Sequence, residues 1–160
     1  MDGEPTFERE FLHLGADLAA ALLDLSRREA PREACGLLLG HPIRAREWRI
    51  ERLAWSPNSA DDPTEGFRIP GRAWARASRR ARAEGLEVVG VFHSHPAAAP
   101  TPSVSDLAAA RRFGEGLDRR VDLIAGRDEE GGWQLAAWRI GPRGVRRLEW
   151  GDADRASRGR

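Results

Sequence analysis

The chain has 160 residues, of which 41% are hydrophobic and 32% charged, a composition typical of one soluble globular domain with a sizeable core. Its formal net charge of +1 excludes a global electrostatic preference for nucleic acid or for an acidic membrane. No apolar run approaches the length of a membrane span, residues 1–10 are polar and unlike a secretory signal, and the single Cys35 cannot form an internal disulfide. We therefore expect a cytoplasmic protein.

Hydrophobic periodicity predicts the elements in the first part of the chain. We expect a first strand, or a lead into the following helix, over residues 7–14. A helix is expected over residues 15–30, where leucines recur at helical spacing and Pro31 ends the pattern. Residues 34–40 are a short apolar run typical of a buried strand, and residues 48–55 alternate between apolar and charged as in a half-exposed strand.

The rest of the chain predicts further helices and strands. Residues 56–66, rich in Pro, Asn and Asp, indicate a loop, and residues 71–84 indicate a helix that Gly85 ends. A central strand is expected over 86–95 and a helix over 103–113. Further strands are expected over 121–125, 133–140 and 145–150. Together these elements predict one α/β domain over residues 1–150, with a mixed β-sheet flanked by helices, and a disordered tail over 151–160.

The expected central strand ends in two histidines, His93 and His95. Residues two apart in a strand point to the same face, so both imidazoles are directed into one space. Asp106 follows after a segment long enough to bring a carboxylate back to that space. Two histidines and one carboxylate match the ligand set of a catalytic zinc whose fourth position is open to water, although the same set also suits iron. The pattern predicts a metallohydrolase.

Hydrolysis also needs a base, and Glu33 is the best candidate. It precedes the apolar run over 34–40, which could lie beside the histidine-bearing strand; the alternative is an ordinary surface carboxylate at the start of a strand. Ser103 is a candidate donor to the oxyanion that forms during attack. It also fits the N-cap of a helix with Asp106 in the first turn, and both roles can hold together because a capped helix start is a rigid mount for a ligand.

Three separated motifs carry a family resemblance: Glu33-x-Cys35-Gly36, His93-x-His95-Pro96 and Pro102-Ser103-x-x-Asp106. In this order and spacing they resemble the JAMM (MPN+) metalloprotease family. The resemblance implies an MPN fold, similar in outline to the cytidine-deaminase fold. It implies zinc held by His93, His95 and Asp106, with Glu33 as general acid/base and Ser103 as oxyanion stabiliser.

Members of that family hydrolyse peptide or isopeptide bonds, commonly after the C-terminal glycines of ubiquitin-like proteins. This short chain leaves little room for the insertions with which some eukaryotic members grip ubiquitin, so it resembles the compact bacterial members, which are linked to sulfur-carrier proteins. The resemblance thus implies a zinc-dependent peptidase or isopeptidase that cleaves after the C-terminal Gly-Gly of a ubiquitin-like or sulfur-carrier protein. The alternative is a non-catalytic MPN scaffold that binds protein partners. The presence of all five site residues favours the enzyme.

A zinc deaminase is excluded by its missing signature, and two other functional interpretations are less favoured than their structural alternatives. A zinc deaminase needs His-x-Glu and a later Pro-Cys-x-x-Cys, whereas the residue two after His93 is His95 and the only cysteine lies upstream. Cys35 is either a nucleophile or a buried thiol. We favour the buried thiol because the sequence offers no evident base to activate a nucleophile. The arginines of the helix over 71–84 are either a solvated face or a nucleic-acid surface, and the near-neutral net charge favours the solvated face.

Overall fold

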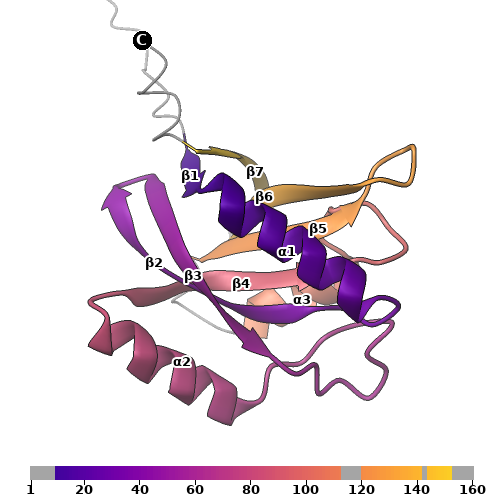
Figure 1. Ribbon diagram of the computed structural model, residues 1–160, viewed down its shortest axis with the longest axis horizontal. Coiled ribbons are helices and arrows are strands. Elements are labelled where there is room, and N and C mark those ends of the chain that lie inside the picture. The colour runs from indigo at the N-terminus through magenta and orange to yellow at the C-terminus, as the bar shows by residue number, and fades with distance from the viewer. Residues whose placement is uncertain (1–9, 113–119, 142–143, 153–160) are drawn as a thin grey trace, which may run out of the picture.

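The computed structural model describes residues 10–112, 120–141 and 144–152. The elements are β1 (Phe11–Leu14), α1 (Ala16–Glu29), β2 (Cys35–Arg44), β3 (Glu47–Ser56), α2 (Gly71–Ala83), β4 (Glu87–Ser94), α3 (Val104–Arg112), β5 (Val121–Arg127), β6 (Trp133–Gly141) and β7 (Gly144–Gly151). Figure 1 shows the strands surrounded by the helices, with α1 and α2 on different sides of the sheet. None of the described helices is long and apolar enough to cross a bilayer.

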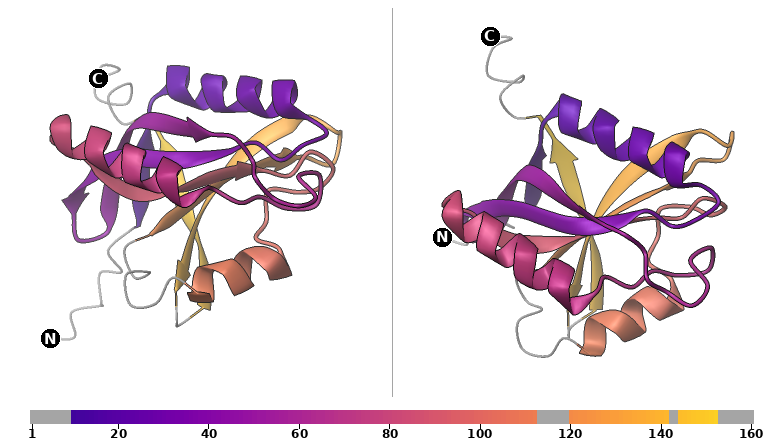
Figure 2. Two further views of the ribbon diagram at one scale, coloured as in Figure 1. Left: turned by 90° about the horizontal axis from the view of Figure 1, so that it is seen from below. Right: turned by 60° about the horizontal axis from the view of Figure 1, so that its bottom comes forward.

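The strands form a closed barrel in the order β1-β3-β2-β4-β5-β6-β7. This corrects the expected mixed sheet flanked by helices: the sheet is mixed, but it closes on itself. Closure depends on β1, which pairs in parallel with β3 along one edge and with β7 along the other, so that Leu12 lies opposite both Trp48 and Trp150. The helices pack outside the strands, and Figure 2 shows α1 and α3 on opposite sides of them.

The barrel interior is apolar and determines which side chains of β4 face outward. Phe92 is fully buried in the cluster that includes Leu38 and Leu123, whereas Val91 packs against α2 in a second cluster with Ala77. Because side chains alternate along a strand, His93 shares the outward face of Val91. The first histidine of the motif therefore lies outside the barrel core, beneath the helices and loops that cover the barrel.

Most of the predicted elements are confirmed, with shifted ends. The buried strand expected over 34–40 continues to Arg44, and the helix expected over 71–84 ends at Ala83, before Gly85 at φ +72°. Gly151, expected in the tail, is the last residue of β7 and pairs with His13 of β1. Residues 7–9 of the expected first strand, residue 113 of the expected helix and residues 153–160 of the expected tail lie outside the described residues.

Candidate metal centre

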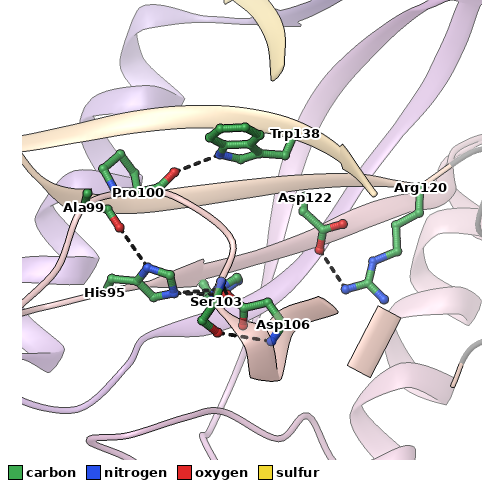
Figure 3. A network of polar contacts seen from close by, with 9 residues as sticks. His95, Ala99, Pro100, Ser103, Asp106, Arg120, Asp122 and Trp138 are labelled. Atoms are coloured by element: carbon green, nitrogen blue, oxygen red, sulfur yellow. Dashed lines mark hydrogen bonds and ion pairs between the residues drawn. The ribbon is translucent and has the colours of Figure 1, made fainter. Parts of the chain in front are cut away.

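The structure brings together the three residues predicted to hold a metal. His93 is near the end of β4, His95 follows that strand, and Asp106 is in the first turn of α3. The two Nε2 atoms are 3.1 Å apart, and each lies 3.2 Å from Oδ2 of Asp106. The three atoms form a nearly equilateral triangle on the outside of the barrel, and Figure 3 shows the side chains of His95 and Asp106 close together.

The size and burial of this triangle fit a metal ion. Ligands about 2.0–2.1 Å from a tetrahedral zinc lie roughly 3.3–3.4 Å from one another, close to the distances of 3.1–3.2 Å found here. His93 is 1% exposed and His95 7%, and the side chain of Asp106 is 9% exposed. The three potential ligands therefore converge where they are almost completely shielded from solvent, as in a preformed metal site. The donor set suits zinc and also iron.

Interactions within the triangle shift the pKa values of Asp106 and His95 in opposite directions. Burial by itself raises the pKa of Asp106, but hydrogen bonds to His93 and His95 outweigh burial and hold that pKa well below its usual range. Burial likewise opposes a charge on His95, yet the hydrogen bond to Asp106 and the carbonyl of Ala99 raise the pKa of this imidazole. A raised pKa favours the protonated imidazole, and protonation of His95 competes with metal binding at Nε2.

A carbonyl of the loop after β4 orients His95. Nδ1 of His95 lies 3.0 Å from the carbonyl oxygen of Ala99, which accepts the Nδ1–H and so orients the ring with Nε2 toward His93 and Asp106. Trp138 Nε1 donates to the carbonyl of Pro100 at 2.8 Å, as Figure 3 shows. The loop packs directly onto β5 at Gly126, where an added Cβ would lie 2.4 Å from Pro100 N. These supporting residues were not predicted from the sequence.

Phe67, from the segment between β3 and α2, covers the other side of the centre. Its ring stacks on the imidazole of His93 with a centroid separation of 4.5 Å and an interplanar angle of 21°. Phe67 also borders an adjacent pocket of about 430 Å³. The pocket is lined by Phe67, Arg68, Ile69, Trp74, Val91, Ser105, Ala108, Ala109 and Arg120. A recess with both apolar and polar lining therefore lies next to Phe67, whose ring stacks on His93.

Glu33 lies at the same end of β4. Cys35 pairs with His93, and Ser94 N donates to the carbonyl of Ala34 at 3.0 Å, which extends this register to place Glu33 beside the end of β4. Glu33 is 8% exposed, so the alternative of an ordinary surface carboxylate is wrong. Burial raises its pKa, and the two imidazoles of the centre oppose part of that rise. A buried carboxyl group next to the candidate metal ligands is consistent with a proton-transfer role.

The backbone around Glu33 is held by the loop after β3. Glu33 N donates to the carbonyl of Pro63 at 2.7 Å, and Nδ2 of Asn58 donates to the carbonyl of Glu33 at 2.9 Å. The same Asn58 amide group donates to the carbonyl of Gly66 at 2.9 Å. The Pro- and Asn-rich segment predicted only as a loop therefore positions the candidate base.

Ser103 caps α3, as its spacing from Asp106 predicts. Asp106 N donates to Oγ of Ser103 at 3.1 Å, and Ser103 N donates to Oδ2 of Asp106 at 2.8 Å. This reciprocal pair satisfies backbone donors at the start of the helix and holds the Asp106 carboxylate in place. The cap uses a lone pair of the Ser103 hydroxyl and leaves its proton to donate elsewhere. The structure thus supports the capping role directly, and the oxyanion role stays a prediction.

Cys35 is a buried thiol, as the sequence favoured. It is 0% exposed, and burial raises its pKa to about 12. Its Sγ contacts the carbonyl of Ser56 at 3.6 Å. A thiol with so high a pKa is a poor nucleophile at neutral pH.

Sequence comparisons identify relatives over about half of the chain. It is 37% identical over 81 residues to "Desampylase" of Pyrococcus furiosus, covering 51% of this chain and 54% of that protein. It is 34% identical over 84 residues to "Probable TtuB-protein conjugate cleaving protease" of Thermus thermophilus, covering 52% and 53%. It is also 33% identical over 88 residues to "Tail tip assembly protein K" of Escherichia phage N15, covering 55% and 32%. The chain spans about half the length of the first two relatives.

Two solved structures share the fold over most of the chain. A protein from Desulfitobacterium hafniense has a TM-score of 0.73 and 28% identity, covering 87% of this chain and 90% of its own. A protein from Salinibacter ruber has a TM-score of 0.62 and 24% identity, covering 88% and 91%. Residues 15–141 match the sequence family described as prokaryotic homologs of the JAB domain. That match includes all five motif residues, and the chain therefore belongs to this prokaryotic JAB family, as its JAMM (MPN+) motifs predict.

Proposed function

We propose that the protein is a zinc-dependent peptidase or isopeptidase that cleaves after the C-terminal Gly-Gly of a ubiquitin-like or sulfur-carrier protein. The observation that carries this proposal is the buried triangle of His93, His95 and Asp106 beside the buried carboxyl group of Glu33. The names of two relatives, one a desampylase and one a protease that cleaves TtuB-protein conjugates, support a substrate of this class.

In this proposal, His93, His95 and Asp106 hold the zinc. When bound, zinc supplies the polarisation that makes water nucleophilic near neutral pH. Glu33 accepts the proton of the attacking water and donates it to the leaving nitrogen, and the rise of its pKa through burial brings it closer to the range in which one group can do both. Its backbone, held by Pro63 and Asn58, keeps the carboxyl group in place for both transfers.

Ser103 stabilises the charge that develops on the carbonyl oxygen. Its hydroxyl proton donates toward that oxygen while a lone pair continues to accept from Asp106 N. Because the cap holds the side chain in one orientation, the donor is arranged before the substrate arrives. A Gly-Gly tail can come close to the centre because glycine has no side chain to clash there. The adjacent pocket offers apolar walls, including Phe67 and Trp74, to a neighbouring side chain of the substrate.

The test is intact-mass analysis of carrier-type proteins extended beyond Gly-Gly, incubated with zinc-loaded protein. We expect the mass of the extension to be lost from the carrier, and Glu33→Gln to abolish this loss. Glu65→Gln is the matched control, because it neutralises an exposed carboxylate near Glu33 by the same substitution and leaves Glu33 itself in place. Cleavage that persists in Glu33→Gln would refute the role of Glu33. Carrier binding without cleavage by the zinc-loaded protein would refute the peptidase and favour the non-catalytic scaffold.

A further inference from the structure

A buried acidic residue outside the family motifs lies next to the candidate metal centre. Asp122 is the second residue of β5 and is 2% exposed. In the parallel pairing of β4 with β5, Asp122 lies opposite Val91, and Ile124 lies opposite His93. Asp122 therefore shares the outward face of β4 and β5 with His93 and is its diagonal neighbour across the two strands.

One oxygen of this carboxylate has a partner and the other does not. Nη2 of Arg120 donates to Oδ1 of Asp122 at 2.7 Å, and Figure 3 shows this ion pair beside the polar network of the centre. Oδ2 of Asp122 is buried and accepts no hydrogen bond from the described residues. A buried acceptor without a donor is energetically costly, so a second role for this oxygen is expected.

His93 presents the complementary atom. Its Nε2 belongs to the triangle with His95 and Asp106, so when Nε2 is a metal ligand the ring proton is on Nδ1. Nδ1 of His93 is buried and has no hydrogen-bond partner among the described residues. By contrast, the Nδ1 of His95 has the carbonyl of Ala99. The ring of His95 is thus oriented by a hydrogen bond, whereas Nδ1 of His93 still needs an acceptor.

The charges of the two groups also interact. Burial raises the pKa of Asp122, while Arg120 and then His93 act to lower it. The pairing of β4 with β5 places the two side chains next to each other on the same face of the strands. The unpartnered donor and the unpartnered acceptor are therefore neighbours as well as chemically matched.

We propose that Asp122 is a positioning residue of the metal centre, whose Oδ2 accepts the Nδ1–H of His93 either directly or through one water molecule. This hydrogen bond keeps His93 in the tautomer that presents Nε2 to the metal. Arg120 holds the carboxylate in orientation through Oδ1. The inference rests on the proposed zinc site and adds to it a carboxylate–imidazole pair that the family motifs do not include.

The first test is the zinc affinity of the whole chain, measured by competition with a chromophoric chelator. Loss of an outer-shell partner typically weakens metal binding by about 10–100-fold, and we expect this for Asp122→Ala. Asp122→Asn keeps the shape and one accepting oxygen, so its affinity should lie between those of Asp122→Ala and the parent protein. Circular dichroism of each variant shows that it is folded. Equal affinity in the parent and in folded Asp122→Asn and Asp122→Ala would overturn the inference.

A second measurement distinguishes an Asp122 that accepts a hydrogen bond from His93 from an Asp122 that only forms the ion pair with Arg120. In ¹⁵N-labelled, zinc-loaded protein, the Nδ1–H of His93 should give a slowly exchanging, downfield-shifted proton signal that disappears in Asp122→Ala. Arg120→Gln is the matched control, because it removes the ion pair and leaves the carboxylate; it should retain the signal. Loss of the signal in Arg120→Gln with retention in Asp122→Ala would refute the pairing. Failure of the parent protein to bind zinc would instead refute the proposed function itself.

Discussion

Gly126→Ala should loosen the candidate metal centre although Gly126 is not one of the three candidate ligands. A Cβ at this position would lie 2.4 Å from Pro100 N and 2.7 Å from both Ala98 O and the carbonyl carbon of Ala99. Ordinary contacts between such atoms are about 3.5 Å, so the loop must move away from β5 by about 1 Å. Overpacking of this kind typically costs about 1–3 kcal/mol of stability.

The displacement would reach the centre through the carbonyl of Ala99. It accepts from His95 at 3.0 Å, and a shift of about 1 Å would take this contact beyond hydrogen-bonding distance. His95 would then lose the group that orients its ring, and zinc affinity should fall by about 10–100-fold. Chelator competition on Gly126→Ala and the parent protein measures this change.

Gly71→Ala is the control for this prediction. Gly71 begins α2, and an added Cβ there would meet nothing within 4 Å. It should therefore bind zinc as tightly as the parent protein. If Gly126→Ala also binds zinc with the parent's affinity while folded, the loop carbonyl does not orient His95, and the reasoning is refuted.

Three further predictions concern the thiol, the barrel core and the loop. Because burial raises the pKa of Cys35 to about 12 from 9.0, its thiolate fraction at pH 8 should be roughly 1000-fold lower than in the unfolded chain. Ellman's reagent should label the unfolded chain and leave the native protein unlabelled over the same time, and rapid native labelling would contradict the burial. The unfolded thiol also ionises first, so the free energy of unfolding should fall as pH rises from about 9 toward 12. Phe92→Ala, at a fully buried core position, should lower the urea-derived free energy of unfolding by about 3–5 kcal/mol, and a loss below 1 kcal/mol would be inconsistent with that packing. Trp138→Phe removes the hydrogen bond to the carbonyl of Pro100 and should lower the free energy of unfolding by about 1 kcal/mol in the same assay. Its loss of zinc affinity should be smaller than that of Gly126→Ala. The opposite order of affinities would refute the greater role of Gly126.

Local patterns in the sequence were sufficient to predict much of the centre. The two-residue period of a strand places His93 and His95 on one face, and the Ser103-x-x-Asp106 spacing produces the helix cap that brings Asp106 to them. Both relationships span a few residues along one segment. They therefore do not depend on how distant strands pair.

Features that depend on distant pairing could not be predicted. Closure of the barrel requires β1 to pair with β7, and nothing in either short segment encodes its partner. Glu33 is buried where the loop after β3 packs against it and Asn58 bonds its carbonyl. The residue type of Glu33 alone favours exposure, so its burial could not be predicted. The contributions of Phe67 and Gly126 arise from packing against β4 and the loop after it, which becomes apparent only when the strand order is known.

The zinc affinity and stoichiometry of the parent protein and of Asp106→Asn test the central claim most directly. Asp106→Asn keeps the shape of the side chain and an oxygen that can accept from Ser103 N, but it removes the anionic ligand. The account predicts one zinc per chain in the parent protein and a loss of affinity in Asp106→Asn larger than the roughly 10–100-fold typical of an outer-shell change. A parent protein that binds no zinc, or an Asp106→Asn variant that binds it equally well, would contradict the claim that His93, His95 and Asp106 form the metal site.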